Sequence, residues 1–190
     1  MPLLVVAAVP LIVALGDPHL AAGPLALVVS TSAGALAISA LALQGLLAAR
    51  LRALDLVLGG GQLRWHRRIG IAVLALVLLH VGALFAVDVD DTLFTLSLDG
   101  PTRSRMASLA TLALAGTVAL GLARGRLPIS VAEWRTLHVF LAVMIIVLGT
   151  GHAVWTQGAM DGVGTWVLIG FAAVGLIAGL SAGLGRAQRR

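Results

Sequence analysis

The chain contains no cysteine, and only 11% of its 190 residues are charged. Without cysteine there can be no disulfide bond, no thiolate-bound iron–sulfur cluster and no thiolate-ligated haem. Covalent haem attachment through a C-x-x-C-H motif is excluded for the same reason. Any haem in this protein would therefore be b-type, with its porphyrin held non-covalently.

The scarcity of charge goes with an excess of apolar residues, which make up 59% of the sequence and recur in long runs. A soluble domain of this length could not bury so much apolar surface. The net charge of +5 could suggest a nucleic-acid partner. The arginines lie at the ends of the apolar segments, however, so we expect a lipid bilayer as the partner and no nucleic acid.

Six apolar segments predict an all-α integral membrane protein with a single transmembrane domain over residues 1–190. The expected spans are residues 3–16, 25–49, 65–87, 105–123, 131–155 and 164–184. The first is short and is interrupted by Pro10, but it has neither the basic start nor the clear cleavage site of a signal peptide. We therefore expect a transmembrane helix there.

The connections between the spans carry turn and cap signals. We expect one loop after Arg50 and Arg52, which contains the glycine run of residues 59–61. We expect another at the acidic stretch Asp88–Asp99, which we interpret as solvated surface. Ser130 is expected to cap the fifth span, with Glu133 at the capping-box position.

The distribution of arginine predicts the orientation in the membrane. Most arginines lie in residues 50–68, 124–135 and 186–190, and only Arg103 and Arg105 break this pattern. Because cytoplasmic connections carry an excess of basic residues, we expect this side and both termini to face the cytoplasm. The expected location is the cell (inner) membrane.

Four of the five histidines form two pairs on apolar segments, with spacing i, i+14: His66/His80 and His138/His152. Fourteen residues are close to four helical turns, so both members of a pair face one side, roughly 21 Å apart. The third and fifth spans run in the same direction in the six-span topology, which brings the two pairs to matching depths. This layout is typical of two stacked bis-histidine haems.

Each depth has one candidate pair of axial ligands. We assign an inner haem iron to His66 and His138, and an outer one to His80 and His152. A lone intramembrane histidine often only bonds a neighbouring helix, but two pairs at identical spacing argue against that interpretation. Metal transport would require carboxylates at the same depth, which both segments lack.

Three arginines are further candidates for cofactor binding: Arg67, Arg68 and Arg135. Such residues are most often topology anchors, and pairing with inner-haem propionates is a compatible second role. No side chain has the setting of a general acid, a general base or a nucleophile, so we expect no catalytic residue.

These motifs resemble the ferric reductase-like transmembrane domain, a family with ferric reductases, the membrane part of NADPH oxidases and the haem subunit of the periplasmic methionine sulfoxide reductase system. Trp65–Gly70 leading to His80 is similar to its third helix. Trp134–His138 leading to His152 is similar to its fifth. The resemblance implies a six-transmembrane-helix bundle with two b haems stacked between helices 3 and 5.

The resemblance also implies electron transfer from a cytoplasmic flavoprotein to an extracytoplasmic acceptor, which we leave open among ferric iron, oxygen, quinone and a protein. The sequence contains no G-x-G-x-x-G motif. We therefore expect an electron-transfer subunit of an oxidoreductase, without its own NAD(P)H site and with any flavin supplied by a flavin reductase partner. The alternatives are a quinol-linked cytochrome b subunit and a non-enzymatic haem-containing membrane assembly subunit.

Overall fold

The computed structural model describes residues 12, 16, 23–156 and 162–187. In this part every regular element is an α-helix, and five helices are long and apolar enough to cross a membrane. They are α3 (Leu25–Ala49), α5 (Gln62–Phe85), α7 (Thr102–Leu122), α8 (Val131–Trp155) and α9 (Gly162–Ala187). The described part is therefore all-helical, and the chain is a multi-pass membrane protein, as predicted. The expected first span, 3–16, lies outside the described residues apart from two positions.

The beginning of α8 depends on a local signal in the sequence. The Ser130 side chain accepts a hydrogen bond from the Glu133 backbone N–H at 3.2 Å, and the Glu133 carboxylate accepts one from the Ser130 N–H at 2.8 Å. This reciprocal pair satisfies two donors that the first helical turn leaves free. The predicted capping box is confirmed.

Two short helices, α4 (Arg52–Leu58) and α6 (Val89–Leu96), lie in connections that we predicted to be loops. Asp88 begins α6 by accepting a hydrogen bond from the Asp91 backbone N–H at 2.9 Å. The chain turns after α4 at Gly59 and Gly60, whose φ angles of 57° and 75° favour glycine. The acidic stretch is therefore a capped surface helix rather than an irregular loop.

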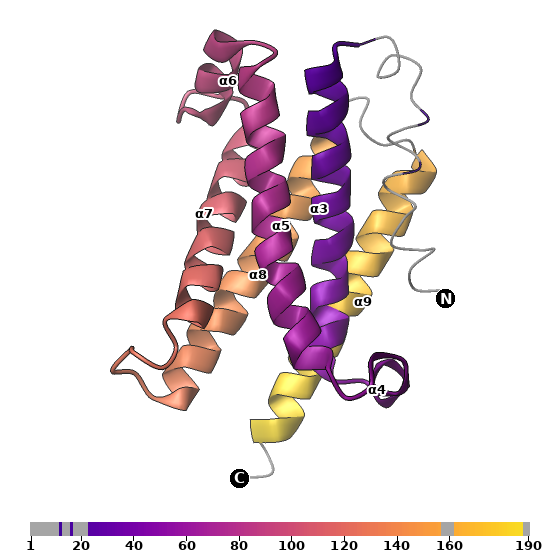
Figure 1. Ribbon diagram of the computed structural model, residues 1–190, viewed down its shortest axis with the longest axis vertical. Helices are drawn as coiled ribbons and strands as arrows, with labels where there is room; N and C mark the ends of the chain where they lie inside the picture. Colours follow the sequence, from indigo (N-terminus) through magenta and orange to yellow (C-terminus); the bar gives the residue numbers. More distant parts are fainter. Residues whose placement is uncertain (1–11, 13–15, 17–22, 157–161, 188–190) are drawn as a thin grey trace.

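The five long helices form a ring in the order α3, α5, α7, α8 and α9, with α9 returning to α3 (Figure 1). Packing is most extensive between α3 and α5, between α7 and α8, and between α3 and α9. Within this ring the backbones of α5 and α8 lie apart, although these helices carry the four paired histidines. The fold thus leaves space between the two histidine-bearing helices.

A layer of aliphatic side chains crosses the middle of the ring. Four helices contribute one buried residue each: Leu41, Val73, Leu114 and Ile145. These four residues border a cavity on each side of the layer. The core therefore divides the interior into two compartments.

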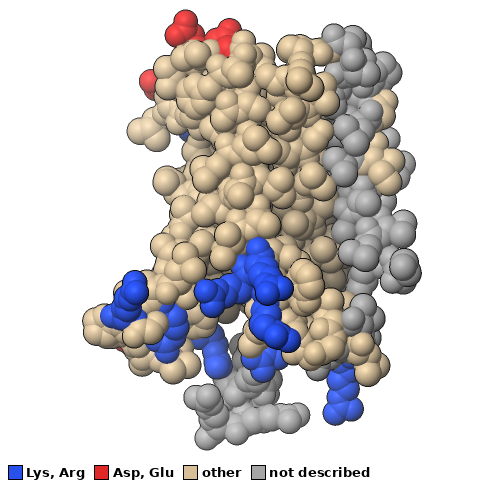
Figure 2. All heavy atoms as spheres, in the orientation of Figure 1, with Lys and Arg blue, Asp and Glu red and all other residues tan. Residues whose placement is uncertain are grey.

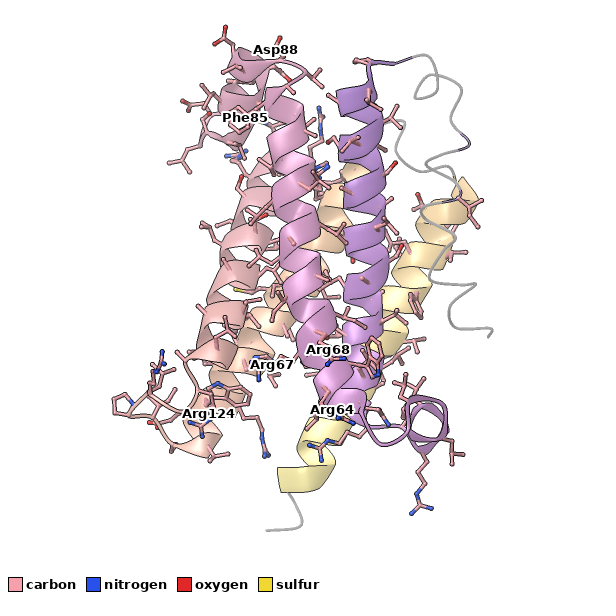
Figure 3. All side chains as sticks on the ribbon, viewed as in Figure 1. Arg64, Arg67, Arg68, Phe85, Asp88 and Arg124 are labelled. Carbon is pink, nitrogen blue, oxygen red and sulfur yellow. The ribbon has the colours of Figure 1, made fainter. Side chains whose placement is uncertain are left out.

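Charge is segregated to the two ends of the bundle. Figures 2 and 3 show basic side chains at one end and acidic side chains at the other. The arginine-rich end carries Arg64, Arg67, Arg68 and Arg124, and Asp88 lies at the acidic end. Two exceptions are Arg103 and Arg105, which lie at the start of α7 beside the acidic end. Glu133 is a third, in the first turn of α8 at the arginine-rich end. Such an asymmetry is what the positive-inside rule uses to orient a membrane protein.

Candidate functional site

The structure brings each histidine of α5 close to one histidine of α8, so that His66 lies opposite His138 and His80 opposite His152. The ring centroids of His66 and His138 are 6.1 Å apart, with an interplanar angle of 67°. Those of His80 and His152 are 6.4 Å apart, with the same angle. Because a metal–imidazole bond is about 2 Å long, an ion held between two imidazoles separates their centroids by about 6 Å. Each pair has the spacing to bind one metal ion from both sides.

The outer pair, His80 and His152, lies nearer the acidic end and borders a cavity of ≈ 510 Å³. This volume lies within the range of about 300–1,000 Å³ for ligand pockets. Most of the lining is apolar, and α6 contributes Thr92 and Thr95 to it. A glycine, Gly34, permits a close approach here, because an added Cβ would lie 3.0 Å from Nδ1 of His80.

Backbone carbonyls hold both outer histidines. Nδ1 of His80 lies 2.8 Å from the carbonyl oxygen of Ser30, and Nδ1 of His152 lies 3.0 Å from that of Arg103. A carbonyl can only accept, so Nδ1 carries the proton in each ring and Nε2 keeps its lone pair. Metal-ligating histidines are commonly oriented in this way.

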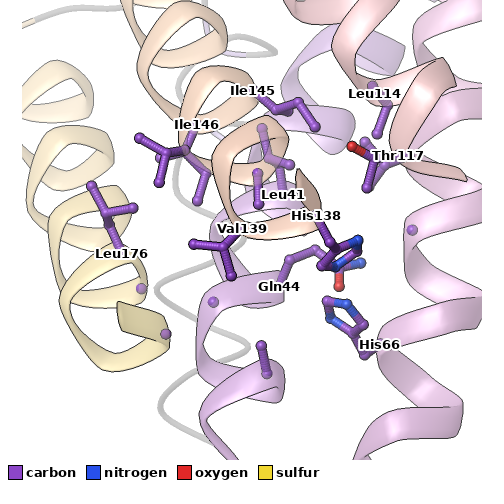
Figure 4. A pocket seen from close by; sticks show the side chains of 18 of the residues that line it. Leu41, Gln44, His66, Leu114, Thr117, His138, Val139, Ile145, Ile146 and Leu176 are labelled. Carbon is purple, nitrogen blue, oxygen red and sulfur yellow. The ribbon is translucent and has the colours of Figure 1, made fainter. Parts of the chain in front are cut away.

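The inner pair, nearer the arginine-rich end, borders a smaller cavity of ≈ 140 Å³ (Figure 4). Gln44 from α3 points toward the two imidazoles and is only 9% exposed. Neither its amide nitrogen nor its amide oxygen has a hydrogen-bond partner among the described residues, and the same holds for Nδ1 of His138. Buried polar atoms are usually hydrogen-bonded, so these atoms are free to bond a water molecule or a bound group.

The donor set fits a haem better than a bare metal ion. In residues 23–156 and 162–187, no group of three or more His, Cys, Asp or Glu side chains could hold a metal. Each pair therefore offers two imidazoles and no further side-chain ligand of those types. A haem iron needs only two axial ligands, because the porphyrin supplies the other four.

The three predicted arginines lie apart from both cavities. Arg67 and Arg68 are exposed, Arg135 is partly exposed, and none of the three is among the described residues that line either cavity. The guanidinium carbon of Arg68 lies 5.8 Å from the ring centroid of Trp65. Binding of haem propionates by these arginines stays a prediction.

Sequence reasoning missed four contributors to the two sites. They are the carbonyls of Ser30 and Arg103, the buried amide of Gln44, and Trp134, which stacks on His138. Gln44 could have been noticed as the only amide side chain in the 25–49 span. Backbone acceptors leave no signal in the sequence, because any residue type supplies one.

The chain was also compared with known proteins. The profile of the ferric reductase like transmembrane component family matches residues 33–149. The chain belongs to this family. The matched range contains His66, His80 and His138, whereas His152 lies just beyond it. The predicted family is therefore confirmed, while no match was found among curated proteins or among solved structures.

Proposed function

We propose that the chain transfers electrons across the membrane between two haem b sites. His66 and His138 would hold the inner haem, and His80 and His152 the outer one. The observation that carries this proposal is that two imidazoles lie opposite each other at each of two levels of the bundle. Their ring centroids are 6.1 Å apart at one level and 6.4 Å apart at the other. Membership of the ferric reductase-like family supports the same function. Bound haem b supplies the one-electron redox chemistry of its iron.

The protein's own residues fix the ligands and exclude water. The carbonyls of Ser30 and Arg103 keep Nε2 of both outer histidines available for a metal. The aliphatic layer between the cavities keeps the path between the two sites dry and of low dielectric. The chain provides ligation, spacing and insulation, and it acts as the electron-transfer subunit of an oxidoreductase.

The ends of the bundle differ in the partners that they favour. The arginine-rich end attracts an acidic flavoprotein, such as a flavin reductase, or the phosphate of a flavin. We assign this end to the cytoplasm of the inner membrane, on the positive-inside rule. Electrons then enter at the inner site and leave at the outer site, beside the acidic end.

Vesicles test this proposal directly. The haem-loaded protein is reconstituted into vesicles that contain trapped ferricyanide, and reduced flavin mononucleotide is added outside. The wild type should reduce the trapped ferricyanide, whereas His66→Ala and His152→Ala should fall to the rate of protein-free vesicles. Gly82→Ala is the matched control on α5, because its added Cβ meets no described atom within 4 Å. Trapped ferricyanide that stays oxidised with the haem-loaded wild type would contradict the proposal.

A further inference from the structure

The inner ligand His138 is held differently from the two outer ligands. Nδ1 of His80 and Nδ1 of His152 each meet a backbone carbonyl, whereas Nδ1 of His138, like that of His66, has no hydrogen-bond partner among the described residues. The imidazole of His138 instead lies against the indole of Trp134, with centroids 4.9 Å apart and ring planes only 12° apart. A parallel stack can therefore restrain the orientation of the His138 ring, but it provides no acceptor for Nδ1.

Trp134 is itself fixed at the arginine-rich end. Its indole N–H donates a hydrogen bond to the carbonyl oxygen of Leu120 in α7 at 3.3 Å. The guanidinium carbon of Arg124, in the turn between α7 and α8, lies 5.5 Å from the Trp134 ring centroid. Trp134 also precedes His138 by four residues, so the two side chains share one face of α8. The indole can therefore restrain the imidazole.

We propose that Trp134 is a positioning residue for His138 and sets the plane of its imidazole. This inference rests on the proposed function, because it concerns one axial ligand of the inner haem. Trp134 acts only through His138 and takes no part in ligation. Trp65, which directly precedes His66 in the sequence, lies against Arg68 rather than against a histidine ring. The restraint is thus specific to the α8 side of the inner site.

The different restraints make the two sites distinguishable. A histidine that donates Nδ1–H to an acceptor is a more basic ligand than one without an acceptor. Loss of the stack would allow the His138 ring to rotate, and this would change the angle of 67° between the inner imidazoles. The largest g value of a low-spin bis-histidine haem depends on this angle, so electron paramagnetic resonance can report the change.

The test compares Trp134→Leu, which removes the stack, with Trp134→Phe, which keeps an aromatic ring but loses the indole N–H. Trp65→Leu is the matched control, because it removes a tryptophan of the same end without touching His138. Three quantities are measured for each haem: the largest g value, the midpoint potential and the rate of haem transfer to apomyoglobin. His138→Ala identifies the inner haem.

Trp134→Leu should shift the g value and the midpoint potential of the inner haem alone. It should also speed release of that haem by about 10-fold or more, as expected when a metal ligand loses its orienting partner. Trp134→Phe keeps a ring to stack but loses the N–H that anchors it, so it should change the inner haem less than Trp134→Leu does. Trp65→Leu should match the wild type. The inference is overturned if Trp134→Leu leaves the inner haem unchanged, or if either Trp134→Phe or Trp65→Leu changes it as much.

A haem-free experiment separates this inference from the proposed function. In apoprotein labelled at histidine, the indole ring current should move the His138 ring protons upfield in the magnetic resonance spectrum. Trp134→Leu should abolish that shift, whereas Trp65→Leu should leave it intact. If the His138 ring protons of the wild type are not shifted, the Trp134–His138 stack is contradicted, even if both haems bind. A wild type that shows the shift but binds no haem would overturn the proposed function instead.

Discussion

At the scale of single residues, the chemistry of the outer site follows from two backbone carbonyls. Because His80 and His152 donate Nδ1–H to carbonyl oxygens, each ring is fixed in one tautomer. Each therefore keeps the Nε2 lone pair that a metal requires. The Ser30 hydroxyl adds a hydrogen bond of 3.0 Å to the carbonyl oxygen of His80 and so joins α3 to α5 at this level.

The pairing of ligands by depth is the first prediction at this scale. His66→Ala and His138→Ala should remove the same haem component, because their imidazoles face each other. His80→Ala and His152→Ala should remove the other. Reduced-minus-oxidised spectra of the four purified variants measure this. Loss of one common component in His66→Ala and His152→Ala would contradict the pairing.

The close approach of Gly34 to His80 gives a second prediction. In Gly34→Ala the new Cβ would lie 3.0 Å from Nδ1 and 3.3 Å from Cε1 of the imidazole, tight enough to push the ring away from the Ser30 carbonyl. Outer-haem affinity should fall by about 10-fold or more. Haem retention after gel filtration measures this, with Gly116→Ala as a control whose Cβ meets no described atom within 4 Å. Unchanged outer-haem retention in Gly34→Ala would be the contrary result.

At the scale of helices, α3 and α9 pack through glycines. An added Cβ on Gly175 would lie 2.7 Å from the carbonyl oxygen of Ala42, and one on Gly45 would meet the Gly175 backbone. Small residues at such crossings let two backbones approach closely within a membrane. This crossing covers the side of the inner cavity to which Gly45 and Gly175 contribute.

Gly175→Ala should therefore destabilise the bundle. Because the obstacle is backbone rather than a flexible side chain, the expected loss in the free energy of unfolding is about 1–3 kcal/mol. Gly170→Ala lies on the same helix with no described atom within 4 Å of the new Cβ, so it should be neutral or stabilise by up to about 1 kcal/mol. Denaturation in mixed micelles gives both values. Equal midpoints for the two variants would argue against a close crossing.

The long helices could be predicted because their signals are local. The apolar runs predicted α3 and α8 with the observed bounds, and the Ser130 capping box predicted where α8 begins. The short helices α4 and α6 were missed because seven or eight residues carry too little apolar pattern to distinguish them from loops. The histidine spacing predicted which side chains meet, but the acceptors for Nδ1 depend on packing against α3 and α7, which no local pattern reveals.

At the scale of the whole molecule, the separation of charge distinguishes the two ends of the bundle, and the aliphatic layer separates its two histidine levels. Most basic side chains gather at one end of the bundle and most acidic ones at the other, although Arg103 lies beside His152 at the acidic end. The layer of Leu41, Val73, Leu114 and Ile145 lies between the two histidine levels. In the proposed function, the arginine-rich end would receive an anionic donor, and the aliphatic layer would insulate the path behind it.

Reduction by an acidic flavoprotein should depend on salt. Its rate should fall as ionic strength rises from about 0.01 M to 0.15 M, where the Debye length shrinks from about 30 Å to about 8 Å. Replacing Arg67 and Arg68 together by glutamine should weaken this dependence, because both are exposed at the arginine-rich end. Stopped-flow measurements with a neutral reductant are the control. A rate independent of salt would contradict electrostatic docking of the donor at the arginine-rich end.

The most direct test of the central claim is the haem content of the purified protein, combined with a redox-titrated absorption spectrum. The account predicts about two haems b per polypeptide, both low-spin because two imidazoles fill the axial positions of each iron. The titration should resolve two components, because the two histidine pairs lie in different surroundings. A haem-to-protein ratio near zero, or a high-spin spectrum, would contradict the claim that the facing histidines are axial ligands.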